Sequence, residues 1–222
     1  MFPDLTADDV FRIETKRLWL RWPKASDAES ISAFVSLAQV ADMTAGIPHP
    51  YPAGEAERFV FRARAQNANG SALILAMAPK PAGRTAAGLI SAAAADADEA
   101  QLGYVVAPAA WGKGFGTEAV KALADLIFTI TRAKRITANA RLDNAASCRV
   151  LEKAGFAVLS RGPEFLPARG KFHNCNRFAL DRESWAATRA GHARPDLRLR
   201  RNRATAPALT ARGDVPVQNV ES

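Results

Sequence analysis

The chain has 222 residues, of which 48% are hydrophobic and 23% are charged. This length and apolar content suit one folded domain with short extensions. No stretch of the sequence approaches the roughly 18 consecutive apolar residues of a membrane-spanning helix. The first residues also lack the basic and apolar regions of a secretory signal. We therefore expect a cytoplasmic protein without membrane contacts.

Few residues are suited to bind a metal or to form disulfides. The two cysteines, Cys148 and Cys175, are too few for a disulfide framework or a Cys-rich zinc site, and the three histidines are far apart in the sequence. We therefore expect no metal. The formal charge of +8 suggests a nucleic-acid partner, but much of the excess consists of arginines near the C-terminus. The net charge therefore says little about the folded part.

The chain begins with a predicted strand and a predicted helix. Apolar and polar residues alternate over 17–22 and stop at Pro23, which is typical of a half-buried strand. Ser26 lies three residues before Glu29, as in a helix cap. Apolar residues then recur at helical spacing, and they predict a helix that contains Ile31, Phe34, Val35 and Ala38.

A second helix and two strands are predicted to follow. Residues 46–52 contain three prolines and predict a loop with an aromatic tip. Beyond this loop, apolar residues at helical spacing predict a helix with the apolar face Ala56, Phe59, Val60 and Ala63. The apolar stretches 71–78 and 85–95 predict two strands joined by a turn.

A glycine-rich turn lies between a predicted strand and a predicted helix. The strand covers 102–106, the glycines fall within 112–116, and an apolar helical face starts after Thr117. In such a turn, backbone N–H groups converge on an anion and the helix N-terminus adds a partial positive charge. We therefore predict a phosphate-binding loop, with a plain linking turn as the alternative. Its spacing matches neither a nucleoside-triphosphate loop nor the dinucleotide fingerprint.

The C-terminal third predicts three more strands and a capped helix. Strands are expected over 135–140, 156–160 and 176–180, and Asp143-Asn144 caps a helix that Gly155 terminates. After Trp185 the sequence is rich in Arg, Ala and Pro, a composition that predicts disorder. We therefore divide the chain into an N-terminal extension (1–13), a folded domain (14–185) and a basic tail (186–222).

Three segments together closely resemble the GCN5-related N-acetyltransferases (GNAT). They are Leu102–Pro108, Trp111–Ala119 and Asn144–Phe156. The strand at Arg17 and the loop at Pro48 also resemble the RimJ/RimL-like branch, which acetylates the N-termini of ribosomal proteins. The resemblance covers about residues 14–181. It implies an α/β (α+β) fold, in which flanking helices surround a mixed sheet of about six to seven strands and two central parallel strands splay apart in a V.

The resemblance implies acetyl-coenzyme A as the cosubstrate, with its pyrophosphate on the glycine loop. Asn144 would bind the pantetheine arm, and a backbone N–H near Val106 would stabilise the oxyanion. Lys113 would add a cation or be a solvated side chain, and Trp111 departs from the family's usual Gln or Arg. The implied cofactor-binding residues are Val105, Val106, Trp111, Gly112, Lys113, Gly114, Phe115, Gly116, Thr117, Asn144 and Ser147.

The resemblance also implies two catalytic residues. Glu164 matches the position of the general base in this branch, and a structural glutamate is the alternative. Ser147 would protonate the leaving thiolate, and an ordinary helix serine is the alternative. Other family members carry a glutamate that acts as the general base at a strand position that Gln101 occupies here, and Gln101 cannot abstract a proton. A water chain near Glu99 and Gln101 therefore remains as a second way to deprotonate the amine.

The expected acceptor is a primary amine, above all the α-amine of a protein or peptide N-terminus. His49, Tyr51 and Phe59 could form an aromatic wall for it. Small amines such as antibiotics or polyamines are the second candidate acceptors. The alternative to an enzyme is a catalytically silent protein that senses acetyl-coenzyme A. Dimerisation is expected from the family alone. The tail arginines, Arg198, Arg200, Arg201 and Arg203, could make weak contacts with nucleic acid, although a solvated tail is the simpler reading.

Overall fold

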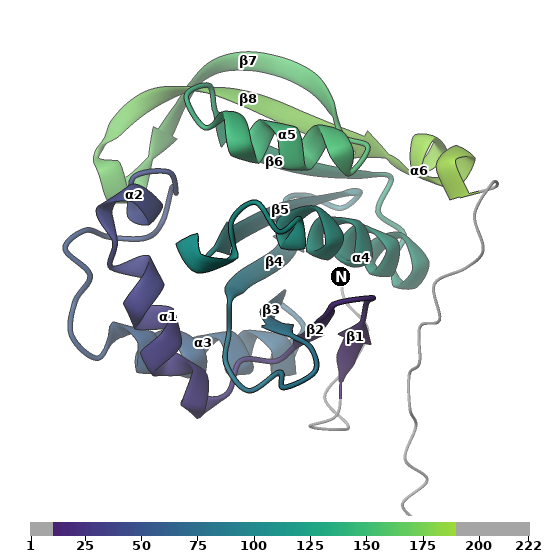
Figure 1. Cartoon of the computed structure of the whole chain (residues 1–222). Helices are drawn as coiled ribbons and strands as arrows, with labels where there is room; N and C mark the ends of the chain where they lie inside the picture. The colour runs from purple at the N-terminus through teal and green to yellow at the C-terminus, as the bar shows by residue number, and fades with distance from the viewer. Residues whose placement is uncertain (1–10, 190–222) are drawn as a thin grey trace, which may run out of the picture.

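A mixed sheet forms the centre of the structure (Figure 1). The computed structural model describes residues 11–189, and within this range the sheet has eight strands in the order β1-β2-β3-β4-β5-β6-β8-β7. The strands are β1 (Arg12–Glu14), β2 (Leu18–Arg21), β3 (Ala72–Pro79), β4 (Gly88–Ala94), β5 (Glu99–Val106), β6 (Arg135–Arg141), β7 (Ala157–Leu166) and β8 (Lys171–Asp181). All neighbours are antiparallel except β5 and β6, which are parallel.

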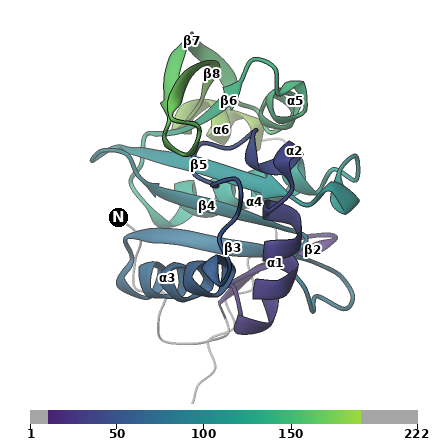
Figure 2. The ribbon, with the colours of Figure 1, turned by 90° about the vertical axis from the view of Figure 1, so that its left-hand side faces the viewer.

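Helices pack on both faces of this sheet (Figure 2). One face carries α1 (Ala28–Val35), α2 (Ala38–Ala41) and α3 (Glu55–Asn69), which share a buried cluster with β3 and β4. The other face carries α4 (Phe115–Ile130), α5 (Ala145–Lys153) and α6 (Arg182–Arg189). Short 3-10 turns lie at η1 (Ala25–Asp27), η2 (Pro108–Ala110) and η3 (Pro167–Arg169). In the described range 11–189, no helix is both long and apolar enough to cross a membrane.

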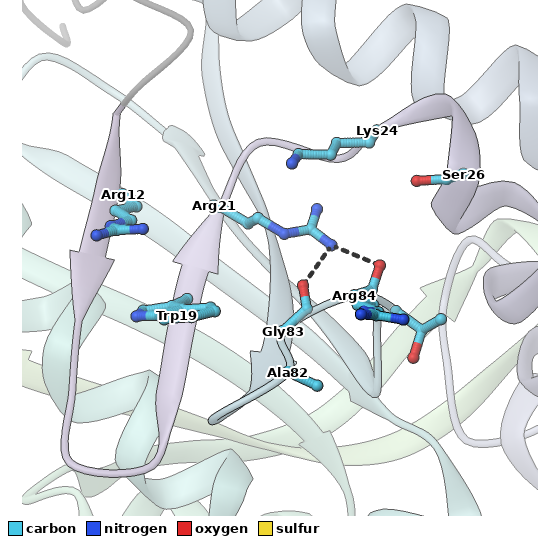
Figure 3. Close-up of a pocket in the computed structure, with 9 residues that line it drawn as sticks. Arg12, Trp19, Arg21, Lys24, Ser26, Ala82, Gly83 and Arg84 are labelled. Atoms are coloured by element: carbon cyan, nitrogen blue, oxygen red, sulfur yellow. Dashed lines mark hydrogen bonds between the residues drawn. The ribbon is translucent and has the colours of Figure 1, made fainter.

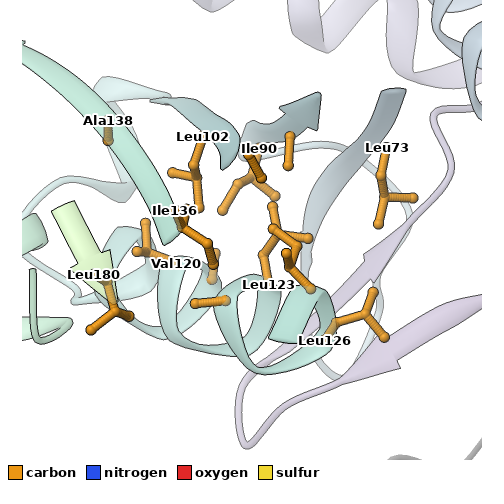
Figure 4. Close-up of a cluster of buried hydrophobic side chains, with 14 of the residues drawn as sticks. Leu73, Ile90, Leu102, Val120, Leu123, Leu126, Ile136, Ala138 and Leu180 are labelled. Carbon is orange, nitrogen blue, oxygen red and sulfur yellow. The ribbon is translucent and has the colours of Figure 1, made fainter. Parts of the chain in front are cut away.

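The larger core lies between α4 and the sheet (Figure 4). The apolar face of α4 recurs at Val120, Leu123 and Ile127, each completely buried. These residues lie three or four positions apart, so they project from the same side of the helix. They belong to one cluster with Leu102 of β5 and Ile136 of β6. This packing fixes α4, and with it the glycine loop at its N-terminus, against the two parallel strands.

Most predicted elements are present, and four details differ. Helix α6 (Arg182–Arg189) was not predicted, and its last four residues fall in the tail that was predicted to be disordered. The predicted cap at Ser26 is wrong: α1 begins after Asp27, and its continuation at Ala38 is the separate helix α2. Strand β1 was not predicted, because three residues are too short for a periodic pattern; it brings the sheet to eight strands. Strands β7 and β8 form a longer hairpin than expected. Residues 1–10 of the predicted extension and 190–222 of the predicted tail, with its arginines, lie outside the described residues.

A buried ion pair explains why Ser26 is not the cap. The Asp27 side chain is fully buried and accepts hydrogen bonds from Arg21 Nη1 at 2.7 Å and Nη2 at 2.8 Å. It also accepts from the Lys24 backbone N–H at 2.8 Å. The carboxylate of Asp27 therefore organises the turn that leads into α1, and the tertiary contact with β2 decides where the helix begins.

We expect Asp27→Asn to lower the free energy of unfolding by about 3 kcal/mol, because it leaves the buried Arg21 charge without its counter-ion. Urea denaturation measures this loss. Asp181→Asn is the matched control, since the Arg135–Asp181 pair is also 2.7 Å long but about half exposed. The control is expected to cost less than about 1 kcal/mol. Equal losses in the two variants would contradict the assigned role of Asp27.

Candidate active site

The two parallel strands separate and leave one edge of β5 open. Pairing between β5 and β6 is confined to Glu99–Gln101 with Arg135–Thr137, whereas β4 pairs with β5 as far as Val106. The Ala107 N–H donates to Ala87, on the β4 side. Because neighbouring residues in a strand face alternate edges, the N–H groups of Tyr104 and Val106 point to the open side. This is the V-shaped splay that the resemblance implied, with unpaired backbone donors inside it.

The glycine loop lies where the splay is widest. Gly112 and Gly114 have φ values of +73° and +75°, a backbone region that side chains disfavour. Gly114 is the N-cap of α4, so the first N–H groups of that helix have no helical partner. The Trp111 indole N–H donates to the Val106 carbonyl at 2.7 Å and ties the loop to the end of β5. The resemblance named Trp111 as a cofactor-binding residue that departs from the family pattern, but it did not indicate this hydrogen bond.

A contact between the β1–β2 hairpin and α4 also holds this loop. Glu118 accepts hydrogen bonds from the Arg17 backbone N–H and Nε, both at 2.7 Å, and from Thr15 Oγ1 at 2.6 Å. Burial acts to raise the pKa of Glu118, but these hydrogen bonds outweigh it and hold the pKa below its usual value. Arg17 Nη1 donates to the Lys113 carbonyl at 2.7 Å. Arg17 therefore brings a cation to the glycine loop, which the sequence pattern did not indicate.

A single cleft of about 1320 Å³ connects the splay to the β7–β8 hairpin. We call it the active-site cleft. All but one of the predicted cofactor-binding residues line it: Val105, Val106, Trp111, Gly112, Gly114, Phe115, Gly116, Thr117, Asn144 and Ser147. The exception is Lys113, whose backbone contacts Arg17 and whose side chain is exposed. Glu164 and Gln101 also line the cleft.

The start of α5 places a hydroxyl pair inside the cleft. Asn144 is the N-cap of α5, and its Oδ1 accepts from the Ser147 backbone N–H at 3.0 Å, as predicted from the sequence. Ser147 Oγ lies 2.8 Å from the Tyr104 hydroxyl, which also donates to the Ser147 carbonyl at 3.1 Å. Burial raises the pKa of Tyr104 to about 12, so the phenol stays protonated. No local pattern indicates a role for Tyr104, because its partner is 43 residues away in the chain.

Glu164 enters the cleft from β7 and shares a strand face with His173 and Cys175 of β8. Glu164 is directly opposite His173, and the pair Gly162–Cys175 is two residues further along. Burial raises the pKa of Cys175, and the nearby Glu164 carboxylate raises it further. Partial burial, with Arg141 and Lys171, lowers the pKa of His173, which favours the neutral imidazole. Glu164 and His173 thus occupy opposite register positions of the hairpin.

The second route to a base is less well placed. Glu99 Oε1 accepts from Arg177 at 2.6 Å and from Thr137 at 2.9 Å. Glu99 does not line the active-site cleft, whereas Gln101 does. The carboxylate nearest to the predicted strand position is therefore engaged in an ion pair outside the cleft.

Most side chains that line the active-site cleft are uncharged, and its cations are Arg141, Arg149 and Lys153. Two carboxylates line the whole cleft, Glu164 and Asp143, and Asp143 pairs with Arg141. Glu164 forms no ion pair with any residue in the range 11–189. Of the three residues proposed as an aromatic wall, Phe59 lines the cleft, and His49 and Tyr51 do not. The uncharged lining includes Met43, Ile47, Phe59, Ile74, Leu89 and Phe165.

The residues present fit the implied acetyl-coenzyme A. Positive-φ glycines and the free N–H groups of α4 suit a pyrophosphate. The cleft volume exceeds the ~300–1,000 Å³ of an ordinary ligand pocket, which leaves room for a long cosubstrate and an acceptor. Within residues 11–189, no group of three or more His, Cys, Asp or Glu is arranged to hold a metal.

Comparison with known proteins places this architecture in a family. An acetyltransferase (GNAT) domain model matches residues 17–157. The uncharacterized N-acetyltransferase p20 of Bacillus licheniformis is 31% identical over 87 residues, which span 39% of this chain and 49% of that protein. RimL, a ribosomal L7/L12 alpha-N-protein acetyltransferase solved with coenzyme A, is 20% identical with a TM-score of 0.67, and the match covers 77% of this chain and 98% of RimL.

A second solved structure has the same fold. RimJ of Mycobacterium smegmatis, in complex with CoA-disulfide, is 20% identical with a TM-score of 0.67, and the match covers 85% of this chain and 97% of RimJ. At this level of identity the likeness concerns the fold alone. The family model, in contrast, spans the β2 strand, the glycine loop and helix α5. The chain therefore belongs to the GNAT acetyltransferase family.

Proposed function

We propose that this protein acetylates the α-amine of a protein or peptide N-terminus. Acetyl-coenzyme A is the acetyl donor used by its family. One observation carries the proposal: a single cleft contains the open end of β5, the glycine loop, Ser147 and the unpaired carboxylate of Glu164. These are the parts that an acyl transfer to an amine requires, namely an anion site, an oxyanion donor, an acid and a base.

In this proposal each residue has a defined task. The bound acetyl-coenzyme A supplies an acetyl thioester. The Glu164 carboxylate removes a proton from the acceptor's ammonium or attacking amine, since an α-amine with a reference pKa of about 7.7–8.0 is mostly protonated at neutral pH. The Val106 N–H lies on the open edge of β5 and donates to the carbonyl oxygen as negative charge develops there. The Ser147 hydroxyl gives its proton to the departing sulfur.

Tyr104 is a positioning residue in this scheme. Its hydroxyl hydrogen-bonds to the Ser147 Oγ at 2.8 Å and so fixes the orientation of the Ser147 hydroxyl. Burial raises the pKa of Tyr104 to about 12, so the phenol acts by its position rather than by giving up its proton. Tyr104 therefore acts through Ser147 and not on the substrate.

An N-terminal α-amine is supported by the lining of the cleft. Within residues 11–189, Glu164 is the one carboxylate of the cleft without an ion pair, and Arg141, Arg149 and Lys153 also line the cleft. The cleft therefore suits a single positive charge better than a polyamine. RimL, with which the fold is shared, is described as an alpha-N-protein acetyltransferase. RimL therefore adds support by analogy of fold.

Mass spectrometry of acetylated products tests the proposal. The protein is incubated with acetyl-coenzyme A and three sets of acceptors: peptides with a free N-terminus, the same peptides with a blocked N-terminus and a lysine, and small amines. We expect acetylation of the free α-amines alone. Transfer only to small amines, or binding of the donor without transfer to any amine, would overturn the proposal. The second result would favour an acetyl-coenzyme A sensor.

A double-mutant cycle tests the hydroxyl pair. We expect Ser147→Ala to lower kcat by about 10- to 100-fold, in the range of general acid catalysis, and Tyr104→Phe to lower it less. Because Tyr104 acts through Ser147, the double variant should resemble Ser147→Ala rather than the product of both losses. The KM for acetyl-coenzyme A is expected to change little. Independent, multiplying losses would contradict the positioning role.

A further inference from the structure

A second pocket of about 500 Å³ lies beside β2, on the face of the sheet that carries α1 (Figure 3). The turn that leads into α1 and the loop between β3 and β4 form its other walls. We call it the basic pocket. It is lined by Arg12, Trp19, Arg21, Lys24, Ser26 and residues 82–85, and it shares no lining residue with the active-site cleft.

The charges of the basic pocket are strongly unbalanced. Four of its nine lining residues are cations and none is an acid. Arg12, Lys24 and Arg84 form no ion pair with any acidic residue between positions 11 and 189. Like charges that converge on one hollow repel each other, and a concave wall concentrates their field. An anion in the pocket would relieve that repulsion.

The fourth cation is built into the floor of the pocket. The Arg21 side chain is 9% exposed, and its Nη atoms bond to Asp27, to the Gly83 carbonyl at 3.3 Å and to the Arg84 carbonyl at 3.4 Å (Figure 3). Its buried Nε–H has no acceptor among the residues described. Buried donors are nearly always satisfied, so this one leaves Arg21 with unused hydrogen-bonding capacity beside the pocket.

The wall of the pocket is shaped by Trp19 and Gly83. A Cβ on Gly83 would lie 2.1 Å from the Trp19 ring, so only glycine permits this contact, and Gly83 has a φ of +54°. The Arg12 guanidinium also lies over the Trp19 ring, 5.1 Å from the ring centroid, in a cation–π contact. These contacts hold the loop and one of the cations in place, so the hollow is a preformed feature of the fold.

We propose that the basic pocket binds a phosphate group. A phosphate carries more than one negative charge and several acceptor oxygens, which the guanidinium and ammonium groups of Arg12, Lys24 and Arg84 match. Ser26 and Thr85 add hydroxyl donors that have no hydrogen-bond partner elsewhere in residues 11–189. The phosphate comes either from a free small molecule or from the phosphodiester backbone of RNA.

Calorimetric titration with inorganic phosphate, and separately with a short single-stranded RNA, tests this site. The full chain is used with coenzyme A present, so that the glycine loop is occupied. The variant Lys24→Gln/Arg84→Gln removes two exposed cations from the pocket. The control Lys121→Gln/Arg132→Gln removes the same charge from exposed positions that line neither pocket. Thermal unfolding checks that all three proteins are folded.

We expect the pocket variant to bind phosphate at least tenfold more weakly than the parent and the control to bind like the parent. An equal loss in the RNA titration would identify a phosphodiester as the source, and unaffected or absent RNA binding would identify a free phosphate. Equal affinities of both variants for both probes, or no binding of either probe to the parent, would overturn the proposal. Acetyl transfer is a separate readout, so the proposed function can fail or succeed independently.

Discussion

Glu164→Gln is expected to lower kcat/KM for an N-terminal acceptor about 100-fold at pH 7, at the lower end of what a general base contributes. Above the pKa of the α-amine, about 7.7–8.0, the acceptor is already deprotonated and needs no base. The loss should therefore shrink as the pH rises past about 8.5. The loss is larger at low pH because the acceptor is then an ammonium ion, which must lose a proton before it can attack. Steady-state rates between pH 6.5 and 9.5 measure the effect.

Glu99→Gln is the matched control for this experiment. Glu99 is bound by Arg177 and Thr137 and does not line the active-site cleft. We expect its pH profile to follow that of the parent protein. A loss that is equal at every pH in Glu164→Gln would exclude Glu164 as the base. A pH-dependent loss in Glu99→Gln instead would point to the water route through Gln101.

Thr117→Asp is expected to weaken acetyl-coenzyme A binding by about 10- to 100-fold. Thr117 is the third residue of α4 and lines the cleft beside the glycine loop. A carboxylate there is placed against the predicted pyrophosphate, and unit charges about 5 Å apart repel by roughly 1–3 kcal/mol near a protein surface. The same carboxylate suits a helix N-terminus, so the fold should not be weakened. Calorimetry measures the affinity for acetyl-coenzyme A, and thermal unfolding measures the stability.

Thr117→Asn has nearly the same shape as Thr117→Asp and no charge. Its affinity is expected to stay within about threefold of the parent value, because only the charge opposes the pyrophosphate. The difference in affinity between the two variants should also become smaller at high salt, because the screening length for exposed charges falls to about 3 Å at 1 M ionic strength. Equal affinities of Asp and Asn variants would refute the assignment of the glycine loop to phosphate binding.

The local sequence pattern was sufficient to predict the elements whose residues interact mainly with their neighbours in the chain. The apolar face of α4, the Asn144 cap of α5 and the positive-φ glycines before α4 each depend on residues within a few positions. The same segments carry the resemblance to the GNAT family, which the domain match confirms. The glycine loop, the cap of α5 and the family could therefore be predicted from the sequence.

The rest depended on contacts between distant residues. Asp27 rather than Ser26 is the N-cap residue of α1, because the Asp27 carboxylate forms a buried ion pair with the Arg21 guanidinium. Tyr104 meets Ser147, and Arg17 meets Glu118, over sequence separations of 43 and 101 residues. No local period can encode such pairs.

The sequence by itself determined the order of strand, glycine loop and helix, and hence the family. Spacing and glycine conformation are properties of short segments, so they can be read before the chain is folded. Only the tertiary structure decided which side chains share a cavity: Glu164 joined the cleft while Glu99 was tied to Arg177, and Arg12, Lys24 and Arg84 converged on one hollow. Those groupings arise from the sheet order and helix packing, which bring together residues that the chain keeps far apart.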